Sequence, residues 1–231
     1  MQFDAIIFDF GNTIIPWGAE QGRALLAAIE GAFADALGPQ EGFLGRAHEA
    51  RDRLIRERED GSLREVTCEE FVRDLCAGEP PAGLIEATAE AGHRAFVEQC
   101  RLPEGRRELI ARLGERYPLA VLSNFFLAGP VEEALQRDGL WDLFEHVEVS
   151  AVEGWMKPHP APFDTCRDKL GTEFEHTLMV GDDFFADIVG GYRAGLLTAL
   201  SHEYRQAPPS DPRAPEVRPD RILGSLDELL D

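Results

Sequence analysis

The stretch Phe3–Thr13 reads FDAIIFDFGNT, and the interpretation of the whole chain begins with it. The apolar run that ends at Phe8 is typical of a buried strand, and it leads through Asp9 directly into a turn containing Gly11. In open α/β sheets, ligands bind at the carboxyl ends of the strands. A carboxylate buried there is costly unless a metal, a cation or hydrogen bonds compensate it. The stretch therefore predicts a ligand site at Asp9.

Composition narrows the class of protein. The chain has 231 residues, of which 44% are hydrophobic, enough for one large domain or for a core domain with a smaller insert. No apolar stretch is long enough to span a bilayer, and the N-terminal run lacks the basic region of a signal peptide. The net charge of -20 disfavours binding to nucleic acids and to membranes. The four cysteines form no C-x-x-C pair, which predicts reduced thiols in a cytoplasmic protein. We expect either a monomer or a homodimer.

Apolar runs and helical patterns alternate along most of the chain. The runs typical of strands are Ala5–Phe8, Leu119–Leu122, His146–Val149, Leu178–Val180 and Leu197–Leu200. The helical patterns are Arg106–Arg116, Pro130–Arg137, Pro160–Leu170 and Asp187–Ala194, with a last short strand at Arg221–Leu223 and a closing helix at Ser225–Leu230. This alternation predicts an α/β fold with a doubly wound parallel sheet.

One interval interrupts the alternation. From residue 16 to residue 100 the pattern is helical, as in the spacing of Leu25, Leu26, Ile29 and Phe33. Thr67–Glu70 reads TCEE, a capping box at the start of a further helix. We therefore expect a helical cap at 16–100, inserted into an α/β core formed by 1–15 and 101–231. An insert after the first strand would cover the site at Asp9.

Four polar clusters follow the predicted strands or precede the predicted helices. Each alone is a weak signal, because such residues are common in turns and helix caps. Their order at the ends of parallel strands makes the signal strong. The clusters are Asp9-Phe10-Gly11-Asn12-Thr13, Ser123-Asn124, Lys157-Pro158-His159-Pro160, and Gly181-Asp182-Asp183 with Asp187.

With these four clusters in this order, the chain resembles the haloacid dehalogenase-like (HAD) hydrolase superfamily over nearly its whole length. The helical interval is similar to the cap that part of this family carries after its first strand. The resemblance implies hydrolysis of a small phosphorylated metabolite with Mg²⁺ as cofactor. It implies catalytic roles for Asp9 as nucleophile, Ser123 as phosphate-orienting hydroxyl and Lys157 as bridging cation, with metal ligands at Asp9, Asp182 and the Gly11 carbonyl, supported by Asp183 or Asp187.

Electrostatics supports these roles independently. A carboxylate that attacks a phosphoryl group is repelled by it, and Mg²⁺, which prefers oxygen ligands, reduces that repulsion. The transition state carries charge on equatorial oxygens that need hydrogen-bond donors. Candidate phosphate-binding groups are the N–H groups around Phe10 and Gly11, the Ser123 hydroxyl, the Asn124 N–H and the Lys157 ammonium. Capture of the phosphoryl group on Asp9 would divide hydrolysis into two steps.

Gly11 is a departure from the family pattern and leaves alternatives open. The resemblance places a second aspartate there, which protonates the leaving oxygen, and such help is worth roughly 10²–10⁴-fold. His159 is a candidate substitute, although it reads more readily as a residue at the start of a helix. A metal-independent 2-haloacid dehalogenase needs no such acid, but Asp182 and Asp183 argue against it. A catalytically weak protein that binds phosphate or a partner is the third interpretation.

Overall fold

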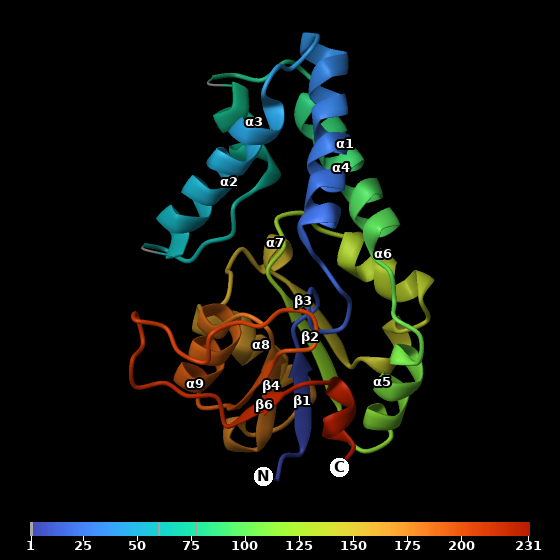
Figure 1. The fold of residues 1–231 in the computed structure, drawn as a ribbon, viewed down its shortest axis with the longest axis vertical. Helices are drawn as coiled ribbons and strands as arrows, with labels where there is room; N and C mark the ends of the chain where they lie inside the picture. The colour runs from blue at the N-terminus through green and yellow to red at the C-terminus, as the bar shows by residue number, and fades with distance from the viewer. Residues whose placement is uncertain (1, 60, 77) are drawn as a thin grey trace.

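The computed structural model describes residues 2–59, 61–76 and 78–231. Within these ranges it contains a six-stranded sheet with the order β3-β2-β1-β4-β5-β6, in which all neighbours are parallel (Figure 1). The predicted doubly wound α/β sheet is therefore confirmed. The strands are β1 (Ala5–Phe8), β2 (Leu119–Ser123), β3 (His146–Val149), β4 (Thr177–Gly181), β5 (Leu197–Ser201) and β6 (Arg221–Leu223).

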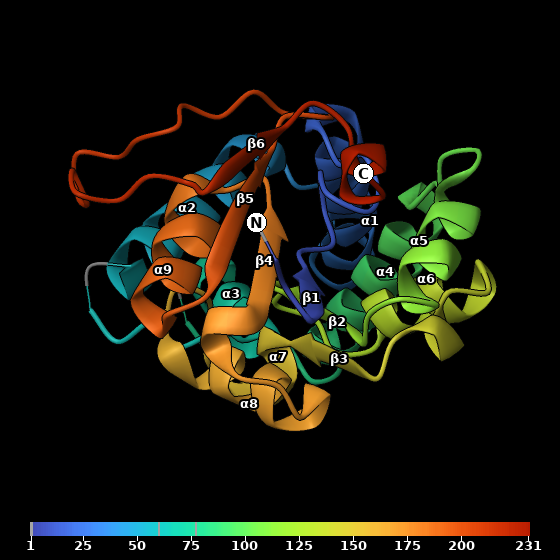
Figure 2. The same cartoon turned by 90° about the horizontal axis from the view of Figure 1, so that it is seen from below.

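The two faces of the sheet separate alternate residues of each strand. Ile6 and Phe8 belong to one apolar cluster, and Ala5 and Ile7 belong to another. The first cluster includes residues of α5 (Arg106–Gly114) and α6 (Pro130–Arg137), and the second includes residues of α8 (Pro160–Leu170) and Ala194 of α9 (Gly190–Ala194). Figure 2 shows these helices on opposite sides of the strands. Both faces are covered, which explains why the central strand β1 is a continuous apolar run.

The chain reverses its direction of winding at β1. From β1 it proceeds to β2 and β3 on one side, and then returns to β4 on the other side of β1. Phe8 pairs with Val121 of β2 and with Val180 of β4, so these three strands end at the same level. Such a reversal opens a crevice at the carboxyl ends of the strands. The fold thus places Asp9 in the position where ligands of this sheet class bind.

In the described part of the chain, four helices lie between β1 and α5, and we call residues 16–100 the helical insert. They are α1 (Ala19–Leu37), α2 (Phe43–Glu59), α3 (Cys68–Cys76) and α4 (Leu84–Gln99). The predicted capping box is present, because Glu70 N donates to Thr67 Oγ1 over 3.1 Å and Thr67 N donates to Glu70 Oε2 over 3.0 Å. Figure 1 shows the insert above the carboxyl ends of the strands. Division of the chain into two domains at these bounds stays an interpretation.

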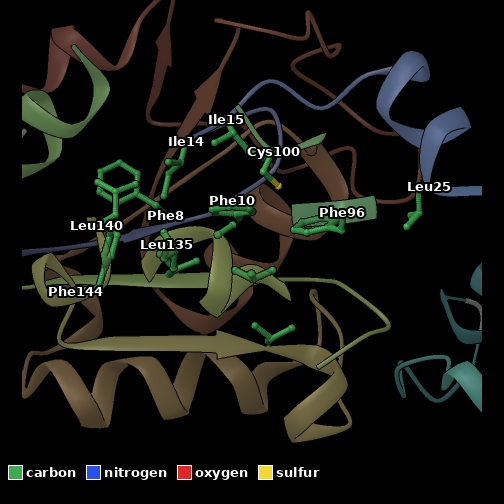
Figure 3. Packing of buried hydrophobic residues seen from close by; sticks show 14 of the residues in the cluster. Phe8, Phe10, Ile14, Ile15, Leu25, Phe96, Cys100, Leu135, Leu140 and Phe144 are labelled. Carbon is green, nitrogen blue, oxygen red and sulfur yellow. The ribbon is translucent and has the colours of Figure 1, made fainter. Parts of the chain in front are cut away.

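Aromatic side chains join the insert to the loops that follow β1 and β2. Phe96 of α4 lies 4.6 Å from Trp17, 4.2 Å from Phe125 and 6.2 Å from Phe10, measured between ring centroids. Figure 3 shows Phe10 and Phe96 side by side. The apolar cluster on this face of the sheet is therefore continuous with the interior of the insert.

The helices near the C-terminus differ from the sequence prediction. The segment expected as one helix at Asp187–Ala194 is a π-helical turn, Phe184–Val189, followed by α9. The closing element is a 3₁₀ turn at Leu226–Leu229 rather than a full helix. Periodicity alone does not distinguish these tighter and wider turns from an α-helix. The remaining short elements are the 3₁₀ turns Trp141–Leu143 and Phe174–His176 and the helix α7 (Ser150–Glu153). Among the described residues, no helix has the length and apolar character needed to cross a bilayer.

Candidate active site

Lys157 connects two carboxylates at the carboxyl edge of the sheet. Its Nζ lies 2.7 Å from Asp9 Oδ1 and 2.7 Å from Asp187 Oδ1, and it donates to the Leu122 carbonyl over 2.7 Å. The Lys157 side chain is only 2% exposed. Burial by itself lowers the pKa of this ammonium, but the carboxylates of Asp187 and Asp9 outweigh burial and raise it. The two carboxylates therefore favour the charged form of Lys157 beside the predicted nucleophile.

Three buried carboxylates gather around this lysine. Asp9, Asp182 and Asp187 each offer a carboxylate oxygen, and these oxygens lie within 4.8 Å of one another. Burial, followed by repulsion from Asp9 and Asp187, raises the pKa of Asp182 to about 8. Burial also raises the pKa of Asp187, to about 7, although Lys157 opposes that shift. The cluster holds more negative charge than its buried surroundings stabilise.

The donor set fits a hard divalent cation. All three ligand candidates are carboxylates, and Mg²⁺ is bound by oxygen donors. Asp182 Oδ2 and Asp187 Oδ1 are buried and have no donor in hydrogen-bond geometry among the residues that the structure describes, although each lies near a cation. Gly181 is required for this arrangement, because a Cβ there would collide with the carboxylate of Asp187. Asp9, Asp182 and Asp187 are thus able to hold Mg²⁺.

Asp183 lies outside this group of three. Its Oδ1 accepts from Phe185 N and from Ala186 N, each over 2.9 Å, so the side chain caps the π-helical turn. Burial alone would raise the pKa of Asp183, but these backbone donors and Arg205 lower it below its ordinary value. Of the two residues predicted to support Asp182, the structure brings Asp187 into the cluster, whereas Asp183 acts as a cap.

Ser123 and Asn124 lie at the end of β2, where the sequence predicts them. The Asn124 side chain also contacts the backbone of Lys157. Ser123 ends β2 and is 6% exposed, at the same edge of the sheet as Asp9. The Asn124 side chain accepts from Lys157 N over 2.7 Å and donates to the Lys157 carbonyl over 3.0 Å. This amide therefore fixes the backbone of the residue that carries the bridging ammonium.

The turn after Asp9 is shaped by its polar residues. Asn12 has a φ of 57°, and its Oδ1 accepts from Trp17 N over 2.9 Å. Thr13 Oγ1 lies 3.4 Å from Asp9 Oδ2. Phe10 is 2% exposed, and Gly11 lies beside Trp17. Asn12 and Thr13 thus serve the geometry of the turn, and position 11 provides no acid.

His159 is a helix-capping residue, as the sequence favoured. Its Nδ1 accepts from Ala161 N over 3.1 Å at the first turn of α8, and its ring stacks on Trp155 with 4.1 Å between centroids. Burial lowers the pKa of this imidazole. With its Nδ1 engaged in the cap and its ring stacked on Trp155, His159 gains no support as a replacement for the missing acid.

Sequence reasoning missed Arg205, which lies in the connection between β5 and β6. Its Nε is 2.7 Å from Asp182 Oδ2, and its Nη2 is 3.0 Å from Asp183 Oδ2. The connection has the composition of an irregular loop, and nothing in its pattern indicates a return to the sheet edge.

A cavity of about 1140 Å³ lies between the helical insert and the loops after β2 and β3. Arg58, Arg73 and Glu70 line it from the insert, and Phe126 and Gly154 line it from the sheet side. Asp9 does not line this cavity, and the whole residue is only 9% exposed. Phe126, which lines the cavity, packs against Phe125, and both follow the Ser123-Asn124 segment in the chain.

Comparison with known proteins shows the family of this chain. The sequence model of the haloacid dehalogenase-like hydrolase family matches residues 3–195. The chain belongs to this family. The match includes all four polar clusters and the helical insert, so membership rests on the parts of the chain that build the site.

Several relatives of this HAD chain are named phosphatases. A ribulose-1,5-bisphosphate 5-phosphatase of Halopiger xanaduensis is 29% identical over 98% of this chain and 98% of its own length. A glyceraldehyde 3-phosphate phosphatase of Pyrococcus abyssi is 32% identical over 49% of this chain and 48% of its own length. The family and these relatives identify this HAD chain as a hydrolase.

Solved structures share the HAD fold. The HAD-hydrolase YfnB of Bacillus subtilis, in a magnesium-bound crystal structure, has a TM-score of 0.73 and 24% identity, covering 99% of this chain and 97% of that one. A 2-haloacid dehalogenase of Pseudomonas syringae has the same TM-score of 0.73 at 22% identity, covering 99% of this chain and 96% of that one. At such identities the likeness concerns the fold alone, because phosphatases and dehalogenases share it.

Proposed function

We propose that this HAD hydrolase is a Mg²⁺-dependent phosphomonoester phosphatase that works through an aspartyl-phosphate on Asp9. The observation that carries the proposal is the buried arrangement in which Lys157 contacts both Asp9 and Asp187 at 2.7 Å, with Asp182 beside them. The phosphatase names of the relatives support the same reaction class.

Each residue of the site has a separate role in the reaction. Asp9 attacks phosphorus with one carboxylate oxygen while the bond from phosphorus to the ester oxygen breaks, and the leaving group departs as its alkoxide, which takes a proton from solvent. Lys157 holds the Asp9 carboxylate in place, and its charge offsets the repulsion between the two anions. Ser123 and the N–H groups of Phe10, Gly11 and Asn124 would bind the oxygens of the phosphoryl group. Water then attacks the aspartyl-phosphate and releases Asp9.

Asp9, Asp182, Asp187 and the Gly11 carbonyl would hold the cation. When bound, Mg²⁺ supplies Lewis-acid neutralisation of charge on the phosphoryl oxygens. The cation would stabilise the ionised forms of Asp182 and Asp187 most, because both carboxylates are buried and have raised pKa values.

Gly11 restricts the substrates that such a site turns over quickly. With no acid at this position, a leaving group must depart with little protonation. The cavity beneath the helical insert offers space for the rest of a small phosphorylated metabolite, and its arginines suit a polar one. The four free thiols suit a reducing compartment, and we propose a cytoplasmic enzyme, either a monomer or a homodimer.

A dehalogenase is the second candidate, because the absence of an acid at Gly11 would not hinder loss of a halide. The excess of buried carboxylates beside Asp9 opposes it, since without a cation they would weaken Asp9 as a nucleophile. A protein that binds phosphate without turnover is a third candidate, because it too would need no acid at Gly11.

The deciding experiment is a screen of phosphorylated metabolites with Mg²⁺ in parallel with 2-haloacids in a chelator. Phosphate release that needs the metal supports the proposal. Halide release in the chelator would establish the dehalogenase instead. No turnover of any phosphoester, or no turnover after a burst of one phosphate per chain, would support the binding protein and reject the phosphatase.

A further inference from the structure

Arg205 reaches the acidic cluster from the connection that joins β5 to β6, drawn in orange to red in Figure 1. Its Nε lies 2.7 Å from Asp182 Oδ2, and its Nη2 donates to the Asp182 carbonyl over 3.1 Å. The same Nη2 donates to Asp183 Oδ2 over 3.0 Å. One guanidinium therefore contacts both members of the Asp182-Asp183 pair.

The segment just before Arg205 is fixed independently of these contacts. Glu203 forms an ion pair with the buried Arg106, and Glu203 Oε2 accepts from Leu226 N over 2.9 Å. Arg106 Nη2 also donates to the Tyr204 hydroxyl over 2.7 Å. Since Glu203 and Tyr204 are anchored, Arg205 is delivered to the sheet edge by the fold and does not depend on Asp182 to order the segment.

The formal charges explain what a second cation at this position does. Asp9, Asp182, Asp183 and Asp187 contribute four negative charges when ionised, and Lys157 and Arg205 contribute two positive ones, which leaves a net of two negative charges. A divalent cation would bring this cluster to zero, so that a phosphate dianion enters a neutral site. Without Arg205 the metal-loaded cluster would keep one negative charge and repel the dianion.

We propose that Arg205 is a second fixed cation of the active site, which weakens the hold of the acidic cluster on Mg²⁺ and strengthens its hold on the phosphate group. The two effects have opposite signs because the guanidinium repels one ligand and attracts the other. The expected effect of Arg205 on phosphate binding rests on the proposed phosphatase function. Its expected effect on Mg²⁺ binding needs only the cluster of carboxylates.

The test is calorimetric titration of the full chain, first with Mg²⁺ and then with inorganic phosphate at saturating Mg²⁺. In Arg205→Gln we expect Mg²⁺ to bind more tightly and phosphate to bind more weakly, each by about three- to tenfold, because the arginine side chain is 46% exposed and partly screened. Arg205→Lys keeps the charge and should stay within about twofold of the wild type in both titrations.

Arg112→Gln, at an exposed position of α5, makes the same change in net charge away from the cluster and should alter neither affinity. Unchanged affinities in Arg205→Gln, or changes in the same direction, would overturn the inference, since a purely structural tether moves both affinities together. Arg205→Met gives a second neutral variant if Arg205→Gln does not fold. A wild-type chain that binds neither ligand would instead reject the proposed function.

Discussion

The carboxyl edge of the sheet and the helical insert above it both contain many charged residues, but they place them differently. At the sheet edge, Lys157 is 2% exposed and contacts two carboxylates that are themselves buried. In the insert, Arg73 and Glu69 form an ion pair with 49% and 54% of their side chains exposed. Exposed pairs contribute roughly 0–1 kcal/mol, whereas buried charges cost several kcal/mol to desolvate.

The difference indicates where function resides. Charges on the insert are solvated and can be rearranged at small cost. Charges at the sheet edge are retained in spite of their desolvation, which is typical of sites that bind ions or carry out chemistry. Each of the following variants tests one side of this contrast.

The largest effect is expected from Asp9→Asn. The amide cannot attack phosphorus, so turnover of any phosphoester that the wild type hydrolyses should fall at least about a thousandfold. Asp4→Asn is the matched control, since Asp4 precedes the same strand with 58% of its side chain exposed, and it should keep full activity. Initial rates of phosphate release decide, and activity retained by Asp9→Asn would reject Asp9 as the nucleophile.

Lys157→Met tests whether the buried charges depend on one another. Its loss leaves Asp9 and Asp187 without their shared cation, so the free energy of unfolding in a chelator should fall by about 3–5 kcal/mol. Arg53→Met removes a cation from the insert that pairs with Asp74 while 48% exposed, and should cost under about 1 kcal/mol. Urea denaturation measures both, and equal losses would contradict the contrast between the two regions.

Gly11→Asp restores the acid that the turn lacks. A Cβ at Gly11 would lie 3.6 Å from Trp17 Cβ, an ordinary contact, so the turn has room for the first atom of the side chain. Turnover of alkyl phosphates, whose alkoxides are poor leaving groups, should rise by about a hundredfold. Turnover of p-nitrophenyl phosphate should rise little, because its leaving group needs no protonation. Gly11→Asn controls for size. No gain in a folded variant would show that another group already protonates the leaving oxygen.

Asp182→Ala tests the metal site. Loss of this carboxylate should raise the Mg²⁺ concentration for half-maximal activity at least about tenfold. Asp183→Asn should cause a smaller shift, because the Asp183 side chain caps the π-helical turn and lies outside the cluster of three carboxylates. Metal titrations of the two variants give the comparison. Equal shifts would return Asp183 to the ligand set.

The smallest effect concerns Glu65, at the junction between the insert and the sheet. Its carboxylate accepts a hydrogen bond from Ser150, and Phe125 N donates to Ser150 Oγ over 2.8 Å. Burial raises the pKa of Glu65, although Ser150 and Arg51 lower it in part, and Glu70 adds to the rise.

Because the folded pKa of Glu65 is raised, the folded state retains a proton that the unfolded state releases. Stability should therefore fall as the pH rises from the ordinary glutamate pKa through the raised one. Glu65→Gln keeps an acceptor for Ser150 and removes this dependence, giving a gain of about 1 kcal/mol or less above the raised pKa. Unfolding free energies across that pH window measure the effect. Parallel curves for the two proteins would refute it.

Much of the fold and part of the site follow from local pattern. The strand runs at Ala5–Phe8 and His146–Val149 and the helix at Pro160–Leu170 have the predicted bounds. The π-helical turn at Phe184–Val189 was not predicted, because the periodicity of apolar residues does not distinguish such a wider turn from an α-helix.

The sequence alone determined that Asp9, Ser123 and Asp182 lie at one edge of the sheet, because each follows a buried run and parallel strands end at a common edge. Only the tertiary structure decided that Asn124 holds the backbone of Lys157 and that Arg205 returns to Asp182 from 23 residues further along the chain. The periodicity and spacing of apolar residues indicate which face of a strand or helix a residue occupies. They do not record where an irregular connection passes, since that path is set by packing and ion pairs between distant segments.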